Sequence, residues 1–327
     1  MKLTQTTILG LATLIALGLA HTASAQITLT AANSNVGASG TPGGGTQGNP
    51  GTPFQGNSGS PGYNAGSNNS YIVNGPTFTG GAGGAITGTD LTATYNGGDG
   101  GDGLAVSGAV AKVNSGMFTG GDGGAADGVG LNLNGGYGGS GLTVFFATAN
   151  VYGGTFQGGN SGAAAGTGTL SSQFAGFGLN ANTNSIVNVY GGNFTGGNTS
   201  NNGGAGDGYI DLGGTTNIYG GSFTGGTNGF GVDVFSGTTI LHGTNFLVNG
   251  LAVSQGAIMG QGTITGNFTD NSGPATSILY RVLPGRNLYI NSAPVPEAST
   301  TVSFGLMLCL GLGGVLAARK KAKANAV

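Results

Sequence analysis

Aspartate is the one residue type in the central chain that could supply carboxylate chemistry. Between residues 26 and 295 there are nine aspartates and no glutamate. Asp211 and Asp233 are separated by about one repeat of the pattern described below, and each lies between two apolar residues. If the apolar neighbours point inward, both carboxylates point outward. They would then stack on adjacent coils within about 5 Å, the separation that retaining glycosidases use.

A polar but inert outer face is the alternative to a catalytic pair. Thr92, Asn132 and Asn180 occupy comparable outward positions, and no Lys or Arg lies nearby in the sequence to bind an acidic sugar. We therefore expect no catalytic residues and no enzymatic activity. A carbohydrate-active enzyme, a polysaccharide lyase or glycosidase that uses Asp211 and Asp233, is the alternative.

Calcium binding is the second chemistry that the aspartates suggest. Residues 97–105 match the nonapeptide Gly-Gly-x-Gly-x-Asp-x-Leu-x of calcium-binding parallel β-rolls, which would make Asp99 and Asp102 ligands. Such ions lie between tandem copies, and the nearest similar stretch carries Ser140 in place of the aspartate. We expect no metal and no cofactor, with calcium at Asp99 and Asp102 as the alternative.

Histidine and cysteine are too few for the other common sites. After residue 25 the only histidine is His242, which occupies the position held by Tyr152, Tyr190 and Tyr219 in earlier repeats, so we expect it in an aromatic ladder. The only cysteine, Cys309, lies in a C-terminal apolar stretch. Zinc sites, nucleophilic triads and disulfides therefore lack partners. The glycine clusters also lack the Lys-Ser/Thr ending of a phosphate loop.

A phenylalanine-centred repeat must position these residues. Short β-rich runs, separated by glycine and asparagine turns, end on Phe78, Phe118, Phe156, Phe194, Phe223, Phe246 and Phe268. The intervals between these phenylalanines shorten along the chain, from near 40 to near 20. The pattern predicts an all-β, single-stranded parallel β-helix (a solenoid) of about ten coils over residues 71–291, with spacings near 20 and near 40 as one and two turns.

The repeat also predicts which side chains form the core. Val or Ile stands five residues before each of the first five phenylalanines, and both positions should point inward and stack from coil to coil. The glycine pairs on either side should form the corners.

The composition of residues 26–295 limits the kinds of molecule that this region can bind. Glycine accounts for 75 of 327 residues, and charged residues for 6%. With nine aspartates against Lys112, Arg281 and Arg286, residues 26–295 carry a net charge of −6, which argues against nucleic acid as a partner. Residues 26–70 are rich in Gly, Pro, Ser and Asn, with interrupted Gly-X-Y runs, and we expect a low-complexity segment ahead of the solenoid.

The N-terminus has the pattern of a secretory signal peptide. Lys2 is followed by an apolar core over residues 8–20 and by the small residues Ala23 and Ala25. This order predicts a signal peptide over residues 1–25 that a signal peptidase cuts before Gln26.

The C-terminus, residues 292–327, has the pattern of a second targeting signal. Val295, Pro296, Glu297 and Ala298 belong to a short motif at residues 295–299, which precedes an uncharged stretch at residues 300–318. That stretch is long enough to form a membrane helix. The basic end at residues 319–323 should remain on the cytoplasmic side, which places the body outside.

This tail resembles the PEP-CTERM sorting signals of Gram-negative bacteria. Pro296 and Glu297 match their motif, and Ala298 replaces the second proline. The resemblance implies processing by an exosortase in a species that makes exopolysaccharide. The body is more loosely similar to pectin-lyase-like and autotransporter-type parallel β-helices, chiefly over residues 256–290.

Together these features predict an exported, non-enzymatic structural protein. It would cross the inner membrane by a Sec-type signal, be anchored transiently by its C-terminal helix, and reach the cell surface or the extracellular matrix. There we expect it to associate with exopolysaccharide. A surface adhesin is a further alternative.

Overall fold

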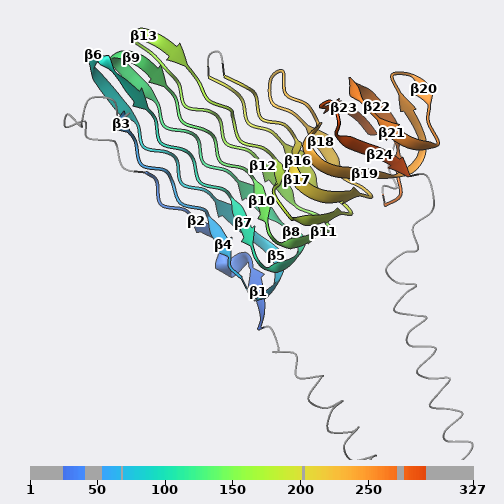
Figure 1. Ribbon diagram of the computed structural model, residues 1–327. Helices are drawn as coiled ribbons and strands as arrows, with labels where there is room; N and C mark the ends of the chain where they lie inside the picture. The colour runs from blue at the N-terminus through green and yellow to red at the C-terminus, as the bar shows by residue number, and fades with distance from the viewer. Residues whose placement is uncertain (1–24, 41–53, 68, 201–202, 271–275, 292–327) are drawn as a thin grey trace, which may run out of the picture.

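The described part of the chain is a β-solenoid. The computed structural model describes residues 25–40, 54–67, 69–200, 203–270 and 276–291. Their strands stack in parallel coils (Figure 1), and a 3-10 turn at Ala31–Asn33 (η1) is the only helical segment among them. Consequently, no helix in these ranges is long and apolar enough to span a bilayer. Outside them lie Ala23, Val295, Pro296, Glu297, Ala298, the expected membrane helix at residues 300–318 and the basic end.

Three columns of parallel strands build each coil. Column 1 contains β1 (Gln26–Thr30), the first parts of β5 (Ser70–Thr79) and β8 (Val110–Thr119), β11 (Thr148–Val151), β15 (Ile186–Val189), the second part of β17 (Tyr209–Ile218), the middle of β19 (Val232–Val248) and β24 (Asn287–Asn291). Column 2 contains β2 (Asn35–Val36), the second parts of β5 and β8, β12 (Thr155–Gln157), β16 (Asn193–Thr195) and β18 (Ser222–Thr224). Column 3 contains β4 (Tyr63–Ala65), β7 (Leu104–Ser107), β10 (Leu142–Phe145), β14 (Leu179–Ala181), the first parts of β17 and β19, and the end of β23 (Thr276–Val282).

The coils are longer and fewer than the sequence suggested. Residues that stack in neighbouring coils lie 40 and 38 apart in the first half of the solenoid, and 29 and 23 apart further on. A spacing near 40 is therefore one long coil rather than two turns, and column 1 holds eight strands. The prediction of about ten coils was wrong because the additional residues leave the coil as a long extension.

The solenoid also begins earlier than expected. β1 pairs in parallel with β5, from Gln26 opposite Ser70 to Thr30 opposite Asn74. Residues 26–40 and 54–67, expected to precede the solenoid, thus supply its first coil. Ala25 and Gln26, at the predicted cleavage site, are exposed at the start of this coil.

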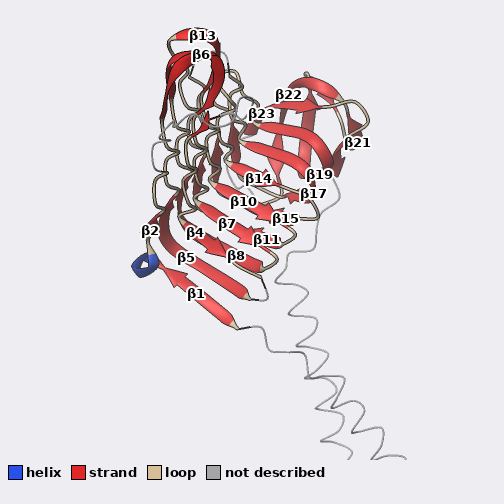
Figure 2. Cartoon of the chain, turned by 60° about the vertical axis from the view of Figure 1, so that its left-hand side comes forward, coloured by secondary structure: helices blue, strands red, loops and turns tan. Residues whose placement is uncertain are grey.

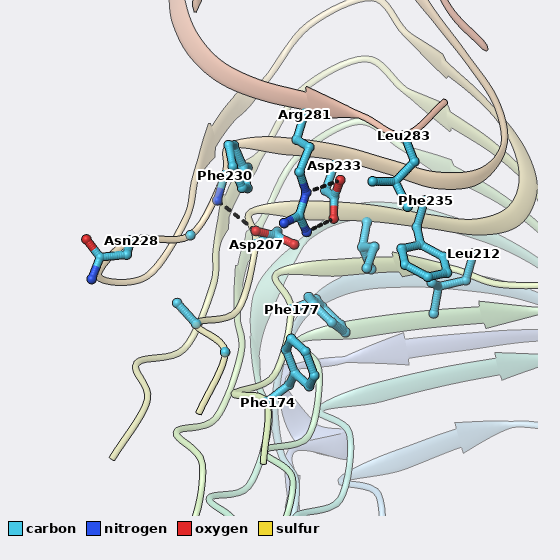
Figure 3. A pocket seen from close by; sticks show the side chains of 14 residues that line it. Phe174, Phe177, Asp207, Leu212, Asn228, Phe230, Asp233, Phe235, Arg281 and Leu283 are labelled. Atoms are coloured by element: carbon cyan, nitrogen blue, oxygen red, sulfur yellow. Dashed lines mark hydrogen bonds and ion pairs between the residues drawn. The ribbon is translucent and has the colours of Figure 1, made fainter. Parts of the chain in front are cut away.

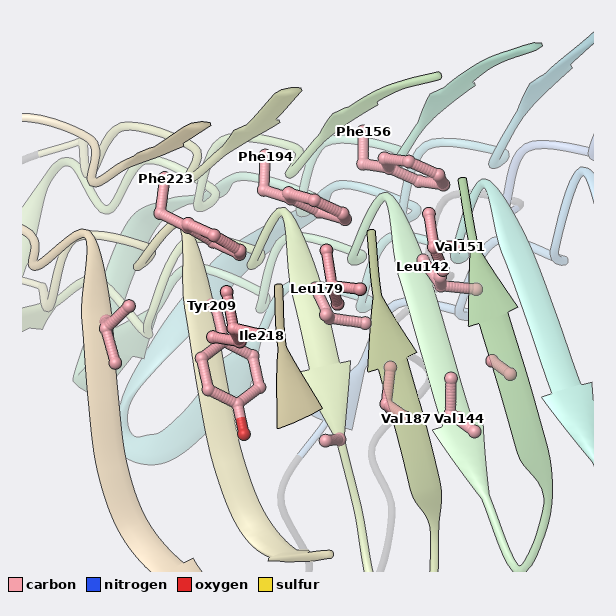
Figure 4. Close-up of a cluster of buried hydrophobic side chains, with 14 of the residues drawn as sticks. Leu142, Val144, Val151, Phe156, Leu179, Val187, Phe194, Tyr209, Ile218 and Phe223 are labelled. Atoms are coloured by element: carbon pink, nitrogen blue, oxygen red, sulfur yellow. The ribbon is translucent and has the colours of Figure 1, made fainter. Parts of the chain in front are cut away.

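A ladder of phenylalanine rings fills the core beside column 2. Phe118, Phe156, Phe194 and Phe223 are buried, and the ring centroids of successive members lie 4.7 to 4.9 Å apart (Figure 4). The Val or Ile residues five positions earlier are likewise buried, as predicted. The side chains that repeat in the sequence therefore form the stacked interior.

A tip sheet closes the far end of the extension. It contains β3 (Phe54–Gln55), β6 (Ile86–Asn96), β9 (Ala126–Asn134) and β13 (Thr167–Ser171), which pair in parallel. Ile86, Tyr95, Ala126 and Leu133 form a small separate core there. Figure 2 shows this sheet held away from the three columns by long loops.

Two layers of glycine-rich chain form those loops. In each long coil one run leaves column 2 for the tip, and a second returns to column 3. In the coils that contain residues 80–102 and 120–140, both runs follow a Gly-Gly-x pattern, as in residues 80–85 and 97–102. The first glycine of a triplet donates within its layer to the next coil (Gly80 N to Thr119 O, 2.8 Å), and the second donates across the layers (Gly101 N to Gly81 O, 2.8 Å). A period of three with hydrogen bonds only to neighbouring runs matches chains of the polyproline II type.

The two layers pack backbone against backbone. A Cβ atom built on Gly100 would overlap the carbonyl oxygen of Gly121, and one on Gly101 would overlap that of Ser60. We call this packing the glycine sandwich. It requires glycine because of the close approach, with no left-handed backbone at these positions.

An antiparallel cap closes the C-terminal end. The last part of β19 pairs antiparallel with β20 (Leu251–Ala252) and β22 (Gly260–Phe268), β22 pairs antiparallel with β23, and β21 (Gln255–Ile258) pairs antiparallel with β24. The sequence predicts Phe246 and Phe268 as the last two repeats. In the structure they do not continue the ladder but pack edge to face in this cap, with ring centroids 5.7 Å apart. The cap covers the strand edge that an open parallel coil would expose.

The glycine sandwich yields the first test. Gly100→Ala should lower the free energy of unfolding by about 1–3 kcal/mol or more, because the new methyl group forces two backbones apart. Gly66→Ala is the matched control, because a Cβ there meets no atom within 4 Å. Equal chemical denaturation midpoints for the two variants would contradict the sandwich.

Candidate functional site

A pocket of about 440 Å³ lies on the outer surface of column 3, where the long coils give way to short ones (Figure 3). Its lining comes from three successive coils and from strand β23 of the cap. The lining residues are Phe174, Phe177, Gly204, Ala205, Asp207, Ile210, Leu212, Asn228, Gly229, Phe230, Asp233, Phe235, Arg281 and Leu283.

Stacking of equivalent positions brings Phe177, Asp207 and Phe230 together. Each immediately precedes the glycine that leads into column 3, and the backbone hydrogen bonds Gly178 N to Asp207 O (3.0 Å) and Gly208 N to Phe230 O (2.9 Å) hold them in register. In earlier coils the same position is small or polar. Large rings enter it only where the extension ends.

Asp207 is a buried carboxyl at the polar end of the pocket. It is 4% exposed, and its Oδ1 accepts the backbone N–H of Phe230 at 2.7 Å. Burial raises the pKa of Asp207 to about 7; the Phe230 N–H and Arg281 act in the opposite direction, and the charge of Asp233 adds to the rise.

Asp233 and Arg281 form a bidentate ion pair beside it (Figure 3). Arg281 Nε donates to Asp233 Oδ1 at 3.0 Å, and its Nη2 donates to Oδ2 at 2.6 Å. Asp233 is fully buried, whereas the Arg281 side chain is 38% exposed and lies 4.6 Å from the centroid of the Phe230 ring. The two residues are direct neighbours across β19 and β23. The pairing supplies the counter-charge that a buried carboxylate needs.

Asp211, the expected partner of Asp233, is elsewhere. In the pairing of β17 with β19, Asp233 stacks on Ile210, and Asp211 stacks on Val234. The separation of the two aspartates along the chain is therefore one position short of the coil length. Since alternate residues of a strand face opposite sides, this shift puts one carboxylate outside the coil and the other inside. The expectation of an outward stacked pair was wrong.

Asp211 instead completes the interior. It is fully buried and accepts hydrogen bonds from the N–H groups of Gly213 (3.1 Å) and Gly214 (2.9 Å) and from the hydroxyl of Thr239 (3.0 Å). Burial raises its pKa, and these donors oppose that rise. Its role is structural.

Asp99 and Asp102 serve the glycine sandwich. Asp99 Oδ1 accepts the N–H of Tyr137 at 3.0 Å, and Asp102 Oδ1 accepts that of Ser140 at 2.7 Å. These bonds satisfy the third N–H of the Gly-Gly-x triplet in the following coil. Burial also raises the pKa of Asp102. In the described chain, no three His, Cys, Asp or Glu side chains gather as a metal site would require.

His242 lies in the aromatic ladder that the sequence predicted. Its ring stacks on Tyr219 at 4.2 Å, and Tyr219, Tyr190 and Tyr152 continue the stack at 4.9 and 4.7 Å. Its Nε2 lies 3.3 Å from Asn217 Oδ1, and burial lowers its pKa. This ladder lies on the outer side of column 1, where Tyr152 is 42% exposed.

Sequence reasoning missed Asp207 and Arg281. Asp207 has a local signal: it occupies the same position before a glycine as Asp102 and Ser140. Arg281 has none, because it lies far beyond Asp233 in the sequence and reaches it only through the cap. The pocket combines hydrogen-bonding groups at one end with phenylalanine and leucine side chains at the other, a composition typical of ligand sites.

Compared with protein-family models, curated proteins and solved structures, the chain matches none of them.

Asp211→Ala should destabilise the fold, by about 3 kcal/mol, because it leaves buried donors without an acceptor. Asp211→Asn retains one acceptor oxygen and should lose less of the free energy of unfolding. Urea denaturation of both variants measures the difference. A wild-type midpoint for Asp211→Ala would show that the carboxylate does not contribute to stability.

Asp207 should make stability depend on pH. The unfolded carboxyl loses its proton near pH 3.8 and the folded one near 7, so between these values the folded state holds the additional proton. Wild-type stability relative to Asp207→Asn should therefore fall as pH rises from about 4 to 7, by on the order of 1 kcal/mol per unit, and level off above. Thermal unfolding of both proteins across this range measures it. Parallel curves for the two proteins would exclude the raised pKa.

Proposed function

We propose that the protein is an exported structural component of the cell surface or extracellular matrix that associates with exopolysaccharide. The export signals and the PEP-CTERM-like tail support the location. The observation that carries the association is an uncharged polar lattice on the outer face of column 2.

The polar lattice consists of side chains that flank the buried phenylalanines. One row contains Thr79, Thr119, Gln157, Thr195 and Thr224, which strand pairing holds in register. The row before the phenylalanines contains Thr77, Thr155, Asn193 and Ser222, and the exposed apolar Met117 interrupts it between Thr77 and Thr155. Their spacing is that of adjacent strands, about 4.8 Å. Hydroxyl and amide groups at a regular interval both donate and accept hydrogen bonds, as the hydroxyls of a polysaccharide do.

A second function has a specific observation in its favour. Asp207 and Asp233 are neighbouring carboxyls in different environments, one with a pKa of about 7 and the other paired with Arg281. A carboxyl group that holds its proton up to about pH 7, next to a second carboxyl group, is the arrangement of general acid catalysis in glycoside cleavage. A carbohydrate-active enzyme that uses Asp207 and Asp233 is therefore the second candidate.

Co-sedimentation with exopolysaccharide from the producing cells tests the proposal. The purified protein should pellet with the polymer, with little change in the bound fraction between about 0.01 and 1 M NaCl, because the lattice is uncharged. The double variant Thr119→Glu and Thr195→Glu should pellet several-fold less, whereas glutamate at the exposed Ala82, on the extension, should have no effect.

Two outcomes would count against this function. A protein that stays in the supernatant does not associate with the polymer. New reducing ends in the incubated samples, absent in Asp207→Asn, would favour the enzyme instead.

A further inference from the structure

The pocket on column 3 is separate from the polar lattice and differs from it in composition, because aromatic rings line part of it. Phe174 and Phe235, on opposite sides of its apolar end, are 52% and 49% exposed. The two half-exposed rings border one hollow, and apolar patches of this kind mark binding sites. Leu212 lies beside Phe235 at the apolar end, on the side away from Asp207 (Figure 3).

Charge at the polar end narrows the ligand class. The ion pair of Asp233 with Arg281 is neutral as a unit, and Asp207 is partly protonated near neutral pH. A fixed anion or cation would meet little opposite charge here. A neutral ligand with hydroxyl groups would meet the carboxyl of Asp207 and the guanidinium of Arg281, of whose five N–H donors Asp233 takes two.

The apolar end sets a second requirement. The ligand must place a flat or apolar face against phenylalanine rings while it presents hydroxyls a few ångströms away. A pyranose ring has both features, because its C–H groups form an apolar face and its hydroxyls project around the rim. An alkyl chain would contact the rings but would form no hydrogen bond with the Arg281 N–H groups that Asp233 does not take.

We propose that this pocket binds a single neutral sugar unit, with its C–H face on Phe174 and Phe235 and its hydroxyls on Asp207 and Arg281. The inference rests on the proposed association with exopolysaccharide for the source of the sugar. The pocket would recognise one sugar unit of the polymer. The polar lattice, in contrast, would contact the polymer along its length.

Calorimetric titration of the full-length protein with the methyl glycosides of glucose, galactose and mannose tests the assignment. At least one should bind, and Phe235→Ala and Phe174→Ala should each weaken that binding about tenfold through the lost ring contact. Phe145→Ala is the matched control, because Phe145 is 39% exposed, on column 3, and does not line the pocket. Both pocket rings are about half exposed, so their loss should leave the fold intact.

The competing ligand classes are tested in parallel. Glucosamine and glucuronate place a positive or a negative charge on the same ring, and binding of either tighter than the neutral glycosides would overturn the proposal. So would the absence of binding by all three glycosides, or unchanged binding in both pocket variants.

Sedimentation separates this inference from the function on which it rests. If the wild type pellets with polymer but no glycoside binds, the pocket assignment fails and the proposed association stands. If glycosides bind through Phe235 and the wild type does not pellet, the assignment stands and the association with this polymer fails.

Discussion

Backbone-to-backbone packing of glycine is the constraint on which this structure depends. Two layers of extended chain approach so closely that a single methyl group would overlap a carbonyl oxygen, as at Gly100 and Gly121. Such chains bury few side chains, so hydrogen bonds within and between the layers must stabilise them. Glycine loses more conformational entropy on folding than any other residue, and this satisfied network offsets the loss.

The same constraint explains how the aspartates are used. A Gly-Gly-x chain can direct two of its three N–H groups to neighbouring backbones, and the third needs an acceptor from the preceding coil. Asp99, Asp102 and Asp207 each provide one. A motif that resembles a calcium loop in the sequence is thus a backbone acceptor in the fold. Asp207 differs because its surroundings also include Asp233 and Arg281.

The pocket forms where the glycine pattern ends. The separation of stacked positions falls from 38 to 29 and then to 23, and the extension that flanks column 3 stops. Phe177 and Phe230 occupy positions that Asp102 and Ser140 hold in earlier coils. The cap then brings Arg281 beside the last coils. A change of coil length therefore creates a concave surface on a rod that is otherwise regular.

The repeating interior can be predicted from the sequence alone. Valine and phenylalanine stand five residues apart, an odd interval that would put them on opposite sides of one continuous strand. A glycine with positive φ between them, such as Gly75 or Gly154, turns the chain from column 1 to column 2, so both side chains face the core. Alignment of the repeats is enough to predict this burial, and it also predicts the place of His242 in the aromatic ladder.

The length of a coil and the residues that meet between coils follow from the folded structure and not from any local pattern. An interval near 40 fits two short turns or one long turn equally well, because glycine permits both. A shift of a single position in the register then decides whether Asp211 faces the core or the pocket, since side chains alternate along a strand. The partners of Asp233 come from other coils and from the cap, and no local pattern encodes them. The register between coils depends on residues that are far apart in the sequence. It is set by the packing of the glycine sandwich and by the number of residues in each coil.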